Sequence, residues 1–191
     1  MRVVFFFICL FCIINVCESD VINTKYYRFI LPDNLDIVYS KPDIITKEEE
    51  ETGAFIKDSK EGFIDIVWRS GRDEIAFRLE SMPAMKASLE DLKSVVQLIY
   101  DKDKDPNICE IDLFELKDIN LGVFKGFEIK KVGKPIGLNQ PKHASVDFCI
   151  TDGELVWMGS LYRIGKPLLP GGGDLSIANF ILENARRKSK Y

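Results

Sequence analysis

The chain has 191 residues, 46% of them hydrophobic and 29% charged, a composition typical of a folded protein with enough length for one domain with a real core. Its 30 Asp and Glu residues outnumber its 26 Lys and Arg residues, which gives a formal net charge of −4. An acidic chain without a basic stripe argues against a nucleic-acid partner, because such partners are bound by clustered cations.

The N-terminal residues have the pattern of a secretory signal peptide. Arg2 supplies a positive charge, and residues 3–16 form an apolar run that suits a signal core and is too short to span a membrane. The sequence therefore predicts a signal peptide over residues 1–19 and a single exported α+β domain over residues 20–191. We expect this domain in a periplasmic or extracellular space.

Two kinds of processing compete at the end of the signal. Cleavage after Ser19, with Cys17 at the third position before the cut, satisfies the small-residue requirement of an ordinary signal peptidase. Alternatively, Cys17 is the lipid-bearing cysteine of a bacterial lipoprotein, although Val16 before it is bulkier than usual. Cys17 is thus a candidate lipidation site, and this lipid is the only membrane contact that we expect.

The first part of the domain reads as a series of short strands joined by turns. Pro32 and Asn34 mark one turn, and Gly62 and Gly71 lie in two further connections. The expected strands are residues 26–31, 35–39, 54–57, 63–69 and 74–79. An acidic run between the second and third of them is expected to form an exposed loop: Glu48, Glu49, Glu50 and Glu51.

The spacing of apolar residues then changes from strand to helix. Ser88 is a good N-cap, with Asp91 three positions later, and five apolar residues follow at helical spacing: Leu89, Leu92, Val95, Val96 and Ile99. Strands return at residues 108–116, 123–131, 145–150 and 155–162. Asp152 and Gly153 suit the tight turn of the last hairpin, and Asp174 is expected to cap a C-terminal helix with one apolar face.

This order of elements predicts an α+β protein with a largely antiparallel sheet and two amphipathic helices packed on it, an α/β sandwich. An early strand that runs into Leu31 and Pro32, the late hairpin at Asp152 and Gly153, and a closing helix give the chain a likeness to a known family. It resembles the PsbP-like α/β/α sandwich domains. The resemblance implies an exported binding module without catalytic machinery, and it transfers no functional residue.

Residues that carry chemistry are sparse. His143 is the single histidine, and with two cysteines in the domain a zinc site of the usual ligands is not expected. The glycines before Asp174 lack the Lys and Ser or Thr of a phosphate-binding loop, and the alternating acids at 101–105 lack the Gly and Glu of a calcium loop. We therefore expect no catalytic residue, metal or cofactor.

Cys109 and Cys149 are the two cysteines of the domain, and an oxidising compartment suggests a disulfide between them. Strand alternation complicates this pairing. Cys109 is in phase with Ile111 on the apolar side of its strand, whereas Cys149 is in phase with Asp147 on the more polar side. The alternative is two separate thiols.

Two features suit contact with another protein. Concentrated negative charge at Glu48, Glu49, Glu50 and Glu51 would steer a basic partner, and aromatic residues near loops, Trp157 and Tyr162, would serve as anchors. Solvated loops and core packing are the alternatives. The leading hypothesis is an exported non-enzymatic binding or inhibitor protein, in its sharpest form a periplasmic immunity protein that neutralises a secreted toxin. The rivals are an accessory envelope lipoprotein or assembly subunit, and a hydrolase that uses acidic residues.

Overall fold

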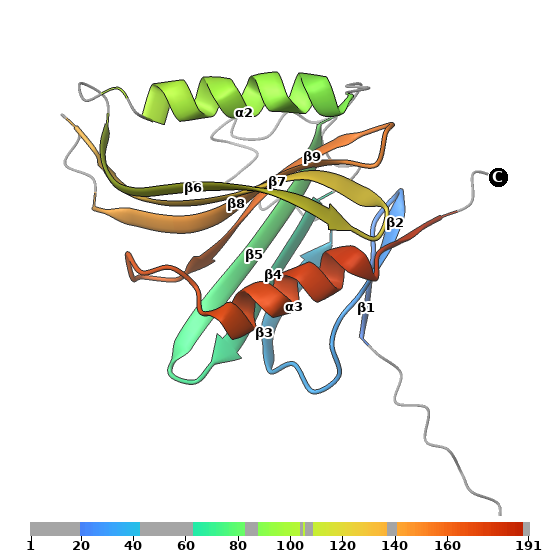
Figure 1. Ribbon diagram of the computed structural model, residues 1–191. Helices are drawn as coiled ribbons and strands as arrows, with labels where there is room; N and C mark the ends of the chain where they lie inside the picture. The colour runs from blue at the N-terminus through green and yellow to red at the C-terminus, as the bar shows by residue number, and fades with distance from the viewer. Residues whose placement is uncertain are drawn as a thin grey trace, which may run out of the picture.

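A seven-stranded antiparallel sheet forms the centre of the structure (Figure 1). The computed structural model describes residues 20–42, 63–82, 88–103, 105, 109–136 and 141–188. The strands of the large sheet are, in spatial order, β3 (Ile37–Pro42), β4 (Phe63–Ser70), β5 (Asp73–Met82), β9 (Val156–Arg163), β8 (His143–Thr151), β7 (Phe124–Pro135) and β6 (Cys109–Leu121). Two meanders, β3 to β5 and β6 to β9, therefore join where β5 pairs with β9.

A second, three-stranded sheet contains β1 (Val21–Asn23), β2 (Tyr27–Ile30) and β10 (Arg186–Arg187), with β2 in the middle. The strand expected at 26–31 thus belongs to this small sheet, and the basic C-terminal segment forms its edge. Tyr27 donates a hydrogen bond to Asp152, and Arg187 forms an ion pair with Glu154. The small sheet is therefore attached to the turn between β8 and β9.

Helix α2 (Leu89–Asp103) lies on one face of the large sheet, and α3 (Gly172–Glu183) lies on the opposite side (Figure 1). The predicted start of α2 is confirmed, since Ser88 Oγ accepts a hydrogen bond from the Asp91 N–H at 3.2 Å and Asp91 Oδ2 accepts one from the Ser88 N–H at 2.8 Å. Leu92 and Val96 of this helix are buried against the sheet.

The start of α3 differs from its prediction. Gly171 occupies the N-cap position, and Asp174 stands three residues further on, inside the first turn. Its Oδ2 atom accepts a hydrogen bond from the Gly171 N–H at 2.9 Å. Asp174 therefore stabilises the helix start from within the helix, where a carboxylate also interacts favourably with the helix dipole.

The main core fills the space between the large sheet, β2 and α3. Its aromatic part contains Trp157, whose ring lies edge-on to Tyr27 with centroids 5.6 Å apart. Trp157 is fully buried, so the hypothesis that it anchors a partner is wrong and core packing accounts for it. The predicted α+β class, two helices packed on largely antiparallel sheets, is confirmed for the described residues.

Candidate functional site

A cleft of about 950 Å³ opens on the face of the large sheet that also carries α2. The helix covers one end of this face, where Leu92 packs in a cluster with Phe127 and Cys149. The cleft lies further along the same strands and is lined at Ser145 of β8 and Tyr162 of β9, which are paired across the two strands. This volume is in the range of ligand pockets.

Four polar residues form one row across the cleft face of β8, β9, β5 and β4. Asp147 pairs with Ser160, Ser160 with Arg78, and Arg78 with Asp65 in the registers of successive strands. Ser160 Oγ donates a hydrogen bond to Asp147 Oδ1 at 2.8 Å, and Lys131 Nζ lies 2.8 Å from Asp147 Oδ2. Arg78 Nε donates one to Asp65 Oδ2 at 3.0 Å. Paired strands therefore hold these side chains in fixed positions.

The ion pairs of this row are asymmetric in their exposure. The side chain of Arg78 is 51% exposed and that of its partner Asp65 only 5%. Lys131 is 35% exposed and its partner Asp147 19%. In both pairs the cation lies nearer to solvent, and the carboxylate lies deeper. A ligand that enters the cleft therefore meets the cationic groups of Arg78 and Lys131 before it meets the two carboxylates.

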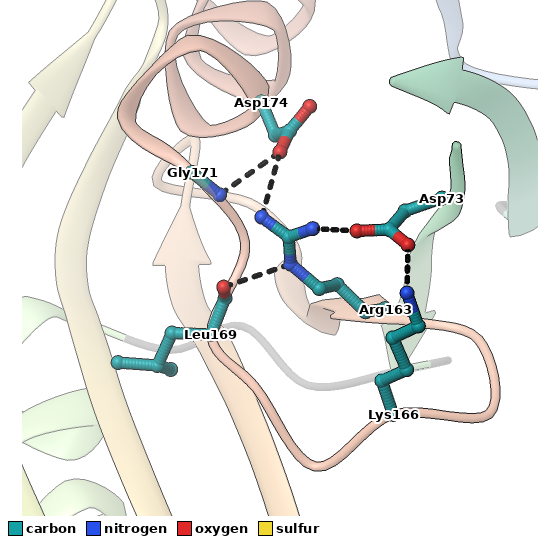
Figure 2. A network of polar contacts seen from close by, with 6 residues as sticks. All are labelled: Asp73, Arg163, Lys166, Leu169, Gly171 and Asp174. Carbon is teal, nitrogen blue, oxygen red and sulfur yellow. Dashed lines mark hydrogen bonds and ion pairs between the residues drawn. The ribbon is translucent and has the colours of Figure 1, made fainter. Parts of the chain in front are cut away.

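The loop that follows β9 forms part of the cleft rim and is fixed by a network around Arg163 (Figure 2). Arg163 forms an ion pair with Asp73 of β5, and its Nε atom donates a hydrogen bond to the Leu169 carbonyl at 3.0 Å. Its Nη2 atom lies 3.9 Å from Asp174 of α3. Lys166 reaches Asp73 from the loop itself. The network thus connects β5, the rim loop and the start of α3.

Asp73 is the acid at the centre of this network. The hydrogen bond from Lys166 is the main cause that lowers the pKa of Asp73, and the positive charges of Lys166 and Arg163 lower it further. The carboxylate is therefore ionised at neutral pH. On the other rim, Lys142 forms an ion pair with Asp112.

Tyr162 is the aromatic residue of the cleft. Its ring is half-buried between Ser145 and Ala76, its partners on the two neighbouring strands. Burial is the main cause that raises the pKa of Tyr162. Its hydroxyl is therefore neutral at physiological pH and suited to donate or accept a hydrogen bond. Of the two aromatic residues predicted as anchors, Tyr162 is the one exposed in a cleft, and its contact with a partner stays a prediction.

Sequence reasoning missed that His143, Ser145 and Asp147 belong to this site. The expected strand begins at residue 145, but His143 is already the first residue of β8 and lies at the cleft with the other two. Residues at alternate positions of a strand share a face, and this alternation was the available signal. Nothing in the sequence indicated that Arg78 and Lys131, far away along the chain, lie beside them.

Comparisons of the chain with family models, curated proteins and solved structures found no match. Within residues 20–42, 63–82, 88–103, 105, 109–136 and 141–188, no three His, Cys, Asp or Glu side chains gather as metal ligands. No helix in that part of the chain is long and apolar enough to cross a membrane.

The predicted disulfide between Cys109 and Cys149 is wrong, because both residues are free thiols that are far apart. Cys109 opposes Pro135 of β7 and Cys149 opposes Phe127 of the same strand. Eight residues of strand separate these positions, a distance of roughly 26 Å, whereas a disulfide requires Cα atoms within about 7 Å. Cys109 lines the cleft, and Cys149 is buried beneath α2, which covers the side of β8 that was expected to be polar.

The two thiols are expected to differ sharply in reactivity. Burial raises the pKa of the Cys149 thiol to about 11, so the reactive thiolate forms only in strongly alkaline solution. Cys109 is half-buried and borders the open cleft. After a fixed incubation of the native protein with iodoacetamide at pH 8, peptide mass mapping should show that Cys109 is modified and Cys149 is not. Equal labelling of both residues in folded protein would contradict the buried position of Cys149.

Two predicted sites lie outside the described residues. These are the candidate lipidation site Cys17 and the acidic run Glu48, Glu49, Glu50 and Glu51.

Proposed function

We propose that the protein is an exported, non-enzymatic binding protein that engages another protein through the cleft. The observation that carries this proposal is the row of polar side chains across β8, β9, β5 and β4 at the cleft. Hydrogen bonds and ion pairs hold these side chains before any partner arrives. A preorganised surface loses little conformational entropy on binding, which favours affinity.

In its sharpest form, the proposal is an immunity protein that neutralises a toxin in the periplasm. The signal-like N-terminus and the small size of the chain support export of a dedicated binder. A rim loop fixed to β5 and α3 by Arg163 supports a rigid recognition surface.

Co-purification with the products of neighbouring genes tests this function. We expect one neighbour to form a stable complex with the protein, and a deletion strain to be intoxicated by that neighbour. Expression of the wild-type chain should restore growth. A Tyr162→Ala variant should restore it less well, because the loss of an aromatic anchor at the centre of an interface typically costs 2 kcal/mol or more, about thirtyfold in affinity. A deletion strain that grows normally and a protein that binds no neighbour would together refute the proposal.

A hydrolase is the second candidate, and one observation favours testing it. His143, Ser145 and Asp147 share the cleft side of β8, and a histidine, a hydroxyl and a carboxylate are the groups used in acyl transfer. Asp147 is engaged by Lys131 and Ser160 in the structure. Turnover of glycan or peptide substrates that disappears in a Ser145→Ala variant would establish this candidate in place of the binding protein.

A further inference from the structure

The cleft is enriched in basic residues although the whole chain is acidic. Five of the residues that line it carry a positive charge, and one, Asp147, carries a negative charge. Over the whole chain, acids outnumber bases by 30 to 26. The basic lining residues are Arg78, Lys131, Lys142, Arg163 and Lys166.

Each of these cations has a carboxylate partner, so the arrangement of the pairs decides the charge that a ligand meets. At the rim, Lys166 is 51% exposed and its partner Asp73 only 16%. The pairs of Arg78 and Lys131 have the same orientation, whereas the Lys142–Asp112 pair is evenly exposed and the Arg163–Asp73 pair is evenly and largely buried. Arg78, Lys131 and Lys166 therefore form the accessible side of the cleft, and the more buried acids fix their positions.

The walls between these cations are apolar. Ile111 of β6 and Ile164, Pro141 and Pro167 at the rim line the cleft together with the aliphatic stems of the lysines. The lining strands run from β5 to β6 across five neighbouring strands, which is a span of roughly 19 Å at about 4.8 Å between strands. An extended peptide of about six residues has this length.

An acidic peptide segment fits this surface better than a nucleic acid does. A long polyanion contacts much of the protein surface and is repelled by the net charge of −4. A short acidic segment contacts the cleft alone, and within the screening length of about 8 Å it interacts mainly with the cations there. Tyr162 is the one Phe, Tyr or Trp residue among the described residues of the lining, which leaves little surface for stacking successive bases.

We infer that the cleft binds an extended acidic segment of the protein partner, with its carboxylates on the exposed cations and its intervening side chains on the apolar walls. This inference rests on the proposed function, in which the partner is a protein. It names the part of the partner that is recognised.

Binding of a synthetic acidic peptide tests the inference without the natural partner. The probe is a fluorescently labelled peptide of about eight residues that alternates Glu and Ala, long enough to cross the cleft. Fluorescence anisotropy should detect its binding to the full chain at low salt. A peptide that alternates Lys and Ala should bind at least about tenfold more weakly, because like charges in an interface are strongly unfavourable.

Charge reversal at the rim locates the binding. Lys142 and Lys166 are exposed at the rim, and Lys142→Glu with Lys166→Glu reverses both charges. Because the second change places a carboxylate beside Asp73, circular dichroism checks that the variant is folded, and Lys142→Glu alone, whose pair with Asp112 is exposed on both sides, gives a second variant with the same expected direction. We expect the double variant to bind the acidic peptide about tenfold more weakly at low salt and the difference to shrink at high salt. The matched control reverses two exposed lysines outside the cleft, Lys93→Glu with Lys125→Glu, and should bind like the wild type.

Three results would overturn the inference: equal binding of the acidic and the basic peptide, equal loss of binding in the rim and control variants, or tighter binding of a single-stranded oligonucleotide than of the acidic peptide. A partner that co-purifies equally well with the rim variant would also overturn it and would leave the proposed function standing. Failure of the proposed function is a separate result, since it is read from the absence of a partner and not from the peptide.

Discussion

Replacing Trp157 by alanine is expected to lower the free energy of unfolding by about 3 to 5 kcal/mol, the usual cost of removing a large aromatic side chain from a core. Its indole is fully buried and contacts an aromatic cluster that joins the large sheet to β2. The ring centroids of Phe29 and Phe124 lie 6.0 Å and 6.1 Å from it. Loss of the indole ring would leave a cavity between elements that are far apart in the sequence.

Urea unfolding followed by circular dichroism measures this loss. Trp157→Phe should cost less, because it keeps an aromatic ring in the cluster. Tyr162→Ala serves as the matched control, since Tyr162 is only half-buried at the cleft, and it should cost clearly less stability than Trp157→Ala. A Trp157→Ala variant with unchanged stability and lost partner binding would instead support the rejected role of Trp157 as a surface anchor.

Replacing Arg78 by leucine is expected to lower the free energy of unfolding by about 2 to 3 kcal/mol. Asp65 is nearly fully buried, and the structure places both Nε and one Nη of Arg78 3.0 Å from its Oδ2 atom. Its Oδ1 atom has no hydrogen-bond partner in the described part of the chain. Leucine would leave the buried carboxylate of Asp65 without its counter-ion. The expected loss of unfolding free energy is smaller than the full cost of breaking a buried ion pair, because the side chain of Arg78 is half-exposed.

A double substitution separates this explanation from a simple loss of packing. Asp65→Val combined with Arg78→Leu removes both charges, and replacing a buried ion pair by apolar residues is often neutral. We expect urea unfolding to show most of the stability restored in the double variant. If the two losses instead add together, the carboxylate is not the cause, and the polar row is not held by this pair.

The parts of the fold that were predictable depend on local signals. The capping residues Ser88 and Asp91 and the helical spacing after them placed α2, and the Asp152 and Gly153 turn placed the β8 and β9 hairpin. In this turn Gly153 has φ +88°, a conformation that glycine adopts without strain. Each of these signals depends only on residues that are close together in the sequence, so contacts between distant segments are not needed to predict the element.

The parts that were not predictable depend on contacts between distant segments. Cys149 alternates with polar residues, yet it is buried because α2 crosses β8 at that point. Arg186 and Arg187 pair with β2, at the other end of the chain, and no residue near them in the sequence indicates this pairing. For the same reason the sequence does not predict the cleft, since β5, β6, β7, β8 and β9 bring its residues together only in the folded sheet.

The most direct test of the central claim, that the cleft is the surface bound by a partner, is the alkylation rate of Cys109 with and without the co-purified partner. Cys109 lines the cleft, so a partner seated there should slow its alkylation at least about tenfold. Mass spectrometry of the proteolytic peptide that contains Cys109 distinguishes its modification from that of every other cysteine. An unchanged rate at Cys109 in a saturated complex would show that the partner binds elsewhere and would contradict the assignment of the cleft.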